Sequence, residues 1–313
     1  MPSAQNCAGY LKYPALMTRQ SPSRLRTRRR ATAYGVAAIV LWSSLALMTL
    51  VTANMPPFQV LSIAFAIGGA CGLLLSLLRG SAGLRELRQP WPAFFLAVVA
   101  LFGYHALYLF AFRHAPAVEV NLVNYSWPLL IVLFAMALPE EKVRGAQLLG
   151  ALLGLSGVVV MVTRGQGISV APVHASGYLA ALLAALTWAA YSVLNRRFQS
   201  VPSAAVAVSC LAVAALAALA HVLLETTVMP SSQQIMVLVA MGLGPVGIAF
   251  RWWDIGTKNG DIAVLGTLSY AAPLLSTLIL LLSGRAGAHV TQAIAVGLLM
   301  LGAAISVRAA QRE

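Results

Sequence analysis

Residues 101–138 carry the sequence LFGYHALYLFAFRHAPAVEVNLVNYSWPLLIVLFAMAL, in which two apolar runs meet at residues 113–116. Polar and aromatic side chains are dense here for so apolar a chain: Tyr104, His105, Tyr108, Glu119, Asn121, Asn124, Tyr125, Trp127 and Pro128. A polar side chain that faces lipid is costly, so such groups turn to the interior of a helix bundle or to a water-filled cavity. We expect the two runs to be neighbouring helices whose polar faces line a common space.

The composition of the whole chain indicates an integral membrane protein. Hydrophobic residues make up 60% of the 313 residues, charged residues make up 9%, and the mean hydropathy is +0.83. Ordinary soluble domains carry about 25% charged residues. The apolar runs are long and continuous, as helical spans of about 20 residues require, whereas barrel strands would alternate over about 10 residues. We therefore predict an all-α polytopic membrane protein, in which the scattered Cys7, Cys71 and Cys210 are packing residues.

Ten membrane-spanning helices are predicted, at residues 33–53, 58–78, 92–113, 117–138, 145–163, 176–196, 204–224, 233–256, 261–282 and 290–308. Alternate loops on one side hold most of the basic residues, namely Arg79, Arg85, Arg88, Lys142, Arg144, Arg196, Arg197 and Lys258. Cytoplasmic loops keep an excess of Lys and Arg, so both termini are predicted to be cytoplasmic. Residues 1–30 are interpreted as a disordered basic cytoplasmic tail that fixes this orientation, with binding to anionic lipid as the alternative.

The chain repeats itself with a shift of 145 residues. The sequence YSWPLL at residues 125–130 falls on YAAPLL at residues 270–275, and Arg113 falls on Lys258. Five spans separate the copies, and an odd number inverts the second copy relative to the first. We therefore predict two inverted five-helix repeats, residues 31–165 and 176–308, around a central cavity.

Two motifs and the span count carry a family resemblance. Span four contains EVNLVNYSWPLL at residues 119–130, and span six contains TWAAY at residues 187–191. With ten spans in two halves, these motifs resemble the EamA-type drug/metabolite transporter superfamily, and within it the branch of bacterial aromatic amino acid exporters. The resemblance covers residues 31–308. It implies a secondary transporter of the bacterial inner membrane that exports amino acids, aromatic and other neutral or small ones, by alternating access of the central cavity.

Aromatic and polar side chains in spans one, three, four and six are the candidate substrate contacts. Aromatic rings offer apolar contact, and the faces of Trp and Tyr also attract an ammonium group. The alternative is a role in packing or in the interfacial belt, which fits His105 and Trp127 least because each lies about ten residues from a span end. The predicted substrate-binding residues are His105, Trp127, Trp188, Tyr104, Tyr108, Tyr125, Asn124 and Trp42.

Few ionisable groups lie inside the predicted spans. We expect Glu119 to pair with Arg113 across a short turn, and Arg251 to pair with Asp254 at i+3 on one helix. Alternatively, Glu119 or His105 carries a proton, since an ordinary histidine has a pKa of about 6.5. Both proton-coupled and uncoupled export therefore stay open.

Prolines and glycines inside the spans predict kinks and close helix contacts. Pro128 and Pro273 occupy equivalent places in the two copies, and each removes a backbone hydrogen bond, which is expected to kink the helix and free a carbonyl. Gly150 and Gly154 form a GxxxG motif, interpreted as close packing within the bundle of a monomer, with a dimer seam as the alternative.

Other functional classes lack their motifs in this chain. The sequence has no HExxH, no GxSxG, no phosphate-binding glycine-rich loop that ends in Lys-Ser/Thr and no close pair of mid-membrane carboxylates. We predict no enzyme activity, metal, cofactor or nucleic-acid partner; the expected partners are an amino acid substrate and the lipid bilayer. Export of another small metabolite or drug is the alternative, and an intramembrane enzyme is a distant one. Phosphate-bearing substrates would call for a mid-membrane basic residue, and only Arg251 qualifies.

Overall fold

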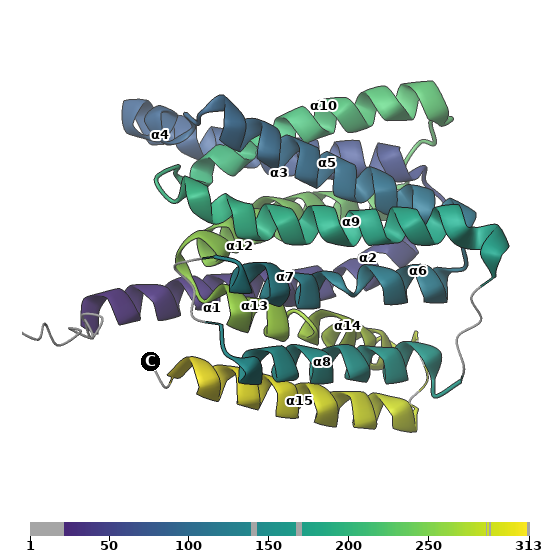
Figure 1. The fold of residues 1–313 in the computed structure, drawn as a ribbon. Helices are drawn as coiled ribbons and strands as arrows, with labels where there is room; N and C mark the ends of the chain where they lie inside the picture. The colour runs from purple at the N-terminus through teal and green to yellow at the C-terminus, as the bar shows by residue number, and fades with distance from the viewer. Residues whose placement is uncertain (1–21, 139–142, 167–170, 286, 288, 312–313) are drawn as a thin grey trace, which may run out of the picture.

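The computed structural model describes residues 22–138, 143–166, 171–285, 287 and 289–311. Within these residues lie ten helical spans, each long and apolar enough to cross a membrane, and all ten predicted spans are present (Figure 1). The first six spans are formed by α1 (Pro22–Ser43) with α2 (Leu45–Val51), α3 (Pro57–Leu78), α5 (Trp91–His114), α6 (Ala117–Asn124) with α7 (Trp127–Met136), α8 (Gly145–Thr163) and α9 (Ala175–Leu194). The last four are α10 (Val206–Leu224), α11 (Ser232–Met241) with η4 (Gly242–Ile248) and α12 (Ala249–Asn259), α13 (Ile262–Leu268) with α14 (Ala271–Leu282), and α15 (Val290–Gln311).

Short helices complete the connections at the span ends. They are α4 (Gly80–Glu86) after the second span, η1 (Pro172–His174) and η2 (Asn195–Phe198) at the two ends of the sixth, and η3 (Ser203–Ala205) at the start of the seventh. The start of α1 and the end of α15 lie toward the same end of the bundle (Figure 1). We call this end the terminal side and the other end the opposite side.

The first helix begins earlier than predicted. Residues 22–30 of the expected disordered tail are helical, while residues 1–21 lie outside the described part of the chain. The reason lies in contacts far along the sequence: the Arg28 guanidinium pairs with Asp261 at 3.0 Å, and the backbone N–H of Asp261 donates to Thr32 Oγ1 at 2.8 Å. These bonds hold the start of α1 against the start of α13.

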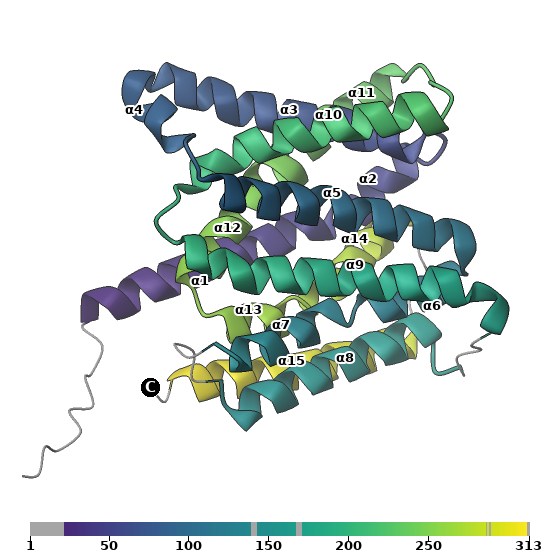
Figure 2. The same cartoon turned by 45° about the horizontal axis from the view of Figure 1, so that its top comes forward.

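Helix packing repeats the two-fold relation that the sequence shift predicts. The most extensive contacts join α8 to α15, α3 to α10, α1 to α12 and α5 to α9. A shift of 145 residues places α8 on α15 and α3 on α10, so each of these pairs joins equivalent helices of the two copies. The same shift places α1 on α9 and α5 on α12, so the α1–α12 pair and the α5–α9 pair are equivalent contacts. Figures 1 and 2 show α8 and α15 side by side along one edge, and α3 and α10 along another. The ten spans therefore form two inverted five-helix repeats, as predicted.

The spans that contain the predicted prolines are interrupted at matching places. The α6–α7 break falls at residues 125–126 and the α13–α14 break at residues 269–270, just before Pro128 and Pro273 respectively. Because proline has no N–H, the helix cannot continue its hydrogen bonding through these positions. Two further interruptions were not predicted, at Ser44 in the first span and at the π-helix η4, which contains Pro245.

The GxxxG motif packs inside the bundle. A Cβ added at Gly302 would lie 2.4 Å from the backbone oxygen of Gly150, and one added at Gly154 would lie 2.4 Å from the ring of Tyr270. The absence of side chains at Gly150 and Gly302 lets α8 and α15 approach closely, and the absence of one at Gly154 leaves room for the Tyr270 ring. The predicted role in packing is therefore what the structure shows for both glycines of the motif.

Candidate functional site

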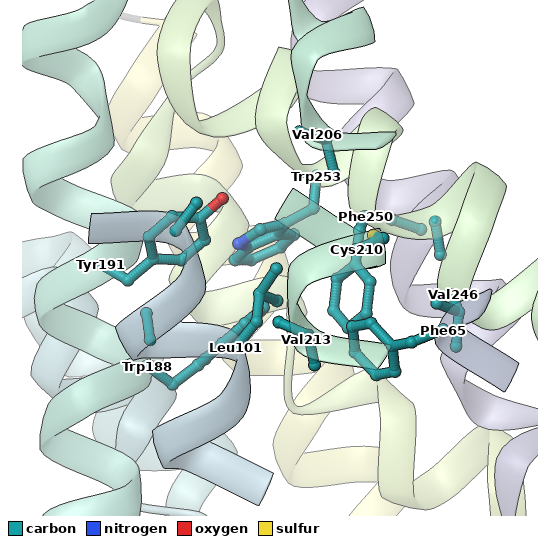
Figure 3. Packing of buried hydrophobic residues seen from close by; sticks show 14 of the residues in the cluster. Phe65, Leu101, Trp188, Tyr191, Val206, Cys210, Val213, Val246, Phe250 and Trp253 are labelled. Atoms are coloured by element: carbon teal, nitrogen blue, oxygen red, sulfur yellow. The ribbon is translucent and has the colours of Figure 1, made fainter. Parts of the chain in front are cut away.

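Aromatic rings from several spans meet in the middle of the bundle. Trp42 of α1 lies 5.6 Å from Trp188 of α9, 5.7 Å from Phe250 and 5.2 Å from Trp253 of α12, measured between ring centroids. Trp127 of α7 meets Trp188 edge to face at 6.4 Å. Figure 3 shows Trp188, Trp253 and Phe250 grouped at this centre. Rings at such distances and tilts attract one another beyond simple burial.

His105 stands at one edge of this ring cluster. Its Nδ1 lies 2.6 Å from the Leu101 carbonyl oxygen, which can only accept, so Nδ1 carries the proton and Nε2 presents a lone pair. The imidazole meets Phe65 edge to face at 5.4 Å and Phe250 at 6.4 Å. It is nevertheless only half-buried, although residues of spans two and eight surround it. The imidazole is therefore partly accessible although rings of spans two and eight contact it.

A polar group lies beside the rings on spans three and four. Asn124 Nδ2 donates to the Tyr104 hydroxyl at 3.2 Å, and the Tyr104 ring lies 5.5 Å from Trp188. The Tyr108 hydroxyl donates to Asn121 Oδ1 at 2.5 Å. Asn124 is 2% exposed, and its Oδ1 is buried without a hydrogen-bond partner among the described residues. An unpaired buried acceptor costs about 1–3 kcal/mol, so this oxygen is available to a hydrogen-bond donor that the described residues do not supply.

The helix break in span four exposes backbone acceptors next to this polar group. Pro128 cannot donate to the Asn124 carbonyl, and the N–H of Leu129 donates to the Tyr270 hydroxyl at 3.1 Å instead of bonding within its own helix. Tyr270 is fully buried, whereas its repeat equivalent Tyr125 is half-buried. The freed carbonyl that the sequence predicted is thus present in span four.

A network of buried polar bonds closes the terminal side. Lys258 Nζ pairs with Asp254 Oδ2 at 2.9 Å and donates to the Val201 carbonyl at 3.0 Å, with both charged side chains at most 4% exposed. Asn195 Nδ2 donates to Asp254 Oδ1 at 2.8 Å. Arg196 adds a bond to the Thr257 carbonyl at 2.8 Å. Together these bonds tie the end of span six and the start of span seven to span eight.

The two repeats differ in how far their equivalent segments are buried. Residues 253–270 of the second copy are almost all buried, whereas many of the equivalent residues 108–125 of the first copy are half-buried or exposed. The Arg113 side chain is 50% exposed, while its equivalent Lys258 is 4% exposed. Because the copies are inverted, these segments lie at opposite ends of the bundle. The structure is therefore closed on the terminal side and less covered on the opposite side.

Both ion pairs expected from local spacing are wrong. Arg113 pairs with Glu225, 112 residues away, at 3.3 Å, and Glu119 Oε2 is buried without a hydrogen-bond partner in the described chain. Asp254 pairs with Lys258 rather than with Arg251. In each case a competing partner lies closer in space than the neighbour on the sequence.

The structure brings the predicted site residues together around one centre. Ring contacts link Trp42, Trp188, Trp127, Tyr104 and His105, and spans three and four place the other three residues, Tyr108, Asn124 and Tyr125, beside them. Sequence reasoning missed Phe65, Phe250 and Trp253 as part of this centre. The repeat contained a signal for two of them, since the 145-residue shift places His105 on Phe250 and Tyr108 on Trp253.

Ten spans in two inverted repeats, with aromatic and polar groups at their centre, define a membrane transporter of the inverted-repeat class. Comparison with known families makes this specific. The EamA-like transporter family matches the chain twice, over residues 30–163 and 175–308, and the chain belongs to this family. Its two matched regions correspond to the two repeats.

Known relatives cover nearly the full chain. It is 50% identical over 287 residues to the aromatic amino acid exporter YddG of Ancylobacter novellus, covering 91% of this chain and 100% of that protein. The protein of the same name from Escherichia coli is 29% identical over 80% of this chain and 87% of its own. A solved crystal structure superposes with a TM-score of 0.87 at 49% identity, covering 91% of this chain and 99% of the other.

Proposed function

We propose that this chain exports amino acids, aromatic ones among them, across the bacterial inner membrane as a secondary transporter. The observation that carries the proposal is the ring cluster at the bundle centre, which brings together the unpaired amide oxygen of Asn124 and the Nε2 lone pair of His105. The names of the similar exporters support the choice of substrate class.

The chemistry of this ring cluster suits an amphipathic zwitterion. Its rings offer stacking to an aromatic side chain, about 0.5–1.5 kcal/mol for each good pair beyond burial. Asn124 Oδ1 and His105 Nε2 are acceptors that an ammonium group can satisfy, and indole faces attract the same charge. The hydroxyls of Tyr104 and Tyr108 can donate to a carboxylate after a small rotation.

Export then requires that the two ends of the bundle open in turn. The buried network of Asp254, Lys258 and Asn195 supports a closed gate on the terminal side. We place that side in the cytoplasm, with both termini, because its loops hold the excess of Lys and Arg. Opening this network would admit substrate from the cytoplasm, and the less covered opposite side would release it.

Purified protein in liposomes tests the proposal. Vesicles loaded in turn with Phe, Trp, Thr, Met and Lys are expected to lose label fastest for the aromatic amino acids, and imposing a proton gradient separates coupled from uncoupled export. Trp188→Ala and Asn124→Leu should each reduce flux by roughly tenfold or more, the equivalent of about 1.4 kcal/mol. Trp91→Ala is the matched control, since Trp91 is 70% exposed at the start of α5. Vesicles that release none of the five amino acids would overturn the proposal.

A further inference from the structure

Arg251 is the basic residue that lies farthest from the end of a span. It stands eight residues before the end of α12 at Asn259, which is about 12 Å along a helix. Every other Lys or Arg within the ten described spans lies within five residues of a span end. A guanidinium at such depth costs several kcal/mol unless it reaches the interface or gains an anionic partner.

The part of the chain that the structure describes offers Arg251 no such partner. Arg251 is exposed, and no hydrogen bond or ion pair joins its side chain to any described residue. The nearest acid along the helix, Asp254, is buried and already bonded to Lys258 and Asn195. The guanidinium therefore keeps all its donors for a group outside the protein.

Arg251 also lines a small cavity where three spans meet. The cavity has a volume of about 30 Å³ and lies between α3, the start of the seventh span and the η4–α12 segment. Its walls include Gly68 and Gly72 of α3, Gly247 of η4, and Ser203 with Cys210 of the seventh span. Gly68, Gly72 and Gly247 let the three walls approach closely, because a Cβ added at any of them would lie 3.0 Å or less from a neighbouring atom. Ser203, whose hydroxyl can donate, lines the same cavity.

These features select a phosphate as the partner. A guanidinium presents a planar fork of donors that matches two phosphate oxygens. The cavity lies toward the terminal side, because its walls include Ser203 at the start of the seventh span and Gly72 near the end of α3. Basic pockets between spans bind anionic lipid headgroups in this way. We propose that Arg251 and the cavity beside it hold the phosphate of an anionic phospholipid in the terminal-side leaflet.

A net negative headgroup is the expected ligand rather than a zwitterionic one. In phosphatidylcholine the choline ammonium neutralises the phosphate of the same headgroup, which weakens its attraction to a second cation. Phosphatidylglycerol has no such internal partner. The bound lipid would bridge α3 and α12, and α12 carries Asp254 and Lys258, so binding is expected to stabilise the fold as well.

The test measures thermal unfolding of the full chain in detergent micelles. Added dioleoylphosphatidylglycerol should raise the unfolding temperature more than the same amount of dioleoylphosphatidylcholine does. In Arg251→Gln the phosphatidylglycerol concentration needed for half of the shift should rise about tenfold or more, the equivalent of 1.4 kcal/mol. Arg197→Gln is the matched control, because Arg197 is exposed at the terminal-side end of span six.

Two further arms keep the test decisive. Inorganic phosphate alone is expected to leave the unfolding temperature unchanged. If inorganic phosphate raises that temperature as much as phosphatidylglycerol does, the ligand is free phosphate and the lipid proposal is wrong. If Arg251→Gln does not fold, Arg251→Lys keeps the charge without the fork, and native mass spectrometry should show weaker retention of phosphatidylglycerol. A lipid response in both Arg251 variants equal to that of the unsubstituted chain overturns the proposal.

Discussion

Replacing Lys258 with methionine should open the terminal side. In the closed arrangement Lys258 Nζ lies 2.9 Å from Asp254, and both side chains are nearly inaccessible. Without the lysine, Asn195 is the one hydrogen-bond partner that the described residues leave to the carboxylate. Leaving one member of a buried ion pair alone costs about 3–5 kcal/mol. Water relieves most of that cost when the gate opens, so the balance should shift toward the open state by roughly a hundredfold or more, at 1.4 kcal/mol per factor of ten.

Hydrogen–deuterium exchange of the protein in nanodiscs measures this shift directly. Amides of residues 253–270, which are almost all buried, should exchange faster in Lys258→Met. The double variant Asp254→Asn, Lys258→Met removes the stranded charge and should recover most of the protection. Arg197→Met is the control, because that exposed side chain lies at the same end. The reasoning fails if Lys258→Met exchanges like the unsubstituted chain, or if the double variant is as labile as the single one.

Two further predictions concern stability. Tyr270→Phe leaves the Leu129 N–H without its acceptor and should lower the free energy of unfolding by about 1–3 kcal/mol, measured as a lower unfolding temperature. Tyr34→Phe, at an exposed tyrosine, should leave that temperature unchanged. Equal effects of the two variants would contradict this prediction. Gly302→Ala forces a Cβ to 2.4 Å from the Gly150 oxygen and should cost about 1–3 kcal/mol. Gly297→Ala, with no atom within 4 Å of the new Cβ, should cost nothing, because alanine favours the helix more than glycine does. A Gly302→Ala protein as stable as Gly297→Ala would refute the contact.

The spans and the repeat could be predicted because they rest on patterns that the sequence displays directly. Length and apolarity define a membrane helix, and a proline removes a donor whatever its neighbours are. Thus the break before Pro128 and its counterpart before Pro273 were anticipated, and the structure shows both. The π-helix at Pro245 was not, since nothing in the apolar run around it distinguishes a wide turn from a kink.

The polar partnerships could not be predicted because tertiary contacts decide them. Spacing shows which groups on one helix are able to meet, but Arg113 reaches Glu225 at the end of span seven instead of Glu119. Asp254 has two basic neighbours on its helix, Arg251 and Lys258. It pairs with Lys258, which is buried with it beside Asn195. The centre of the site shows the same limit, because neither composition nor spacing indicates that Trp253 stacks toward Trp188 at 6.1 Å.

The bond from the Leu129 N–H to the Tyr270 hydroxyl joins one repeat to the other, and its mirror counterpart would run from the Leu274 N–H to the Tyr125 hydroxyl. Tyr270 is fully buried in this bond while Tyr125 is half-buried, so among the described residues the bond is made on one side of the two-fold relation and not on the other. Incorporating 3-fluorotyrosine would give these two rings separate ¹⁹F resonances. Their relative shifts would then act as a spectroscopic gauge of which face of the membrane the protein addresses, without any probe attached to its surface.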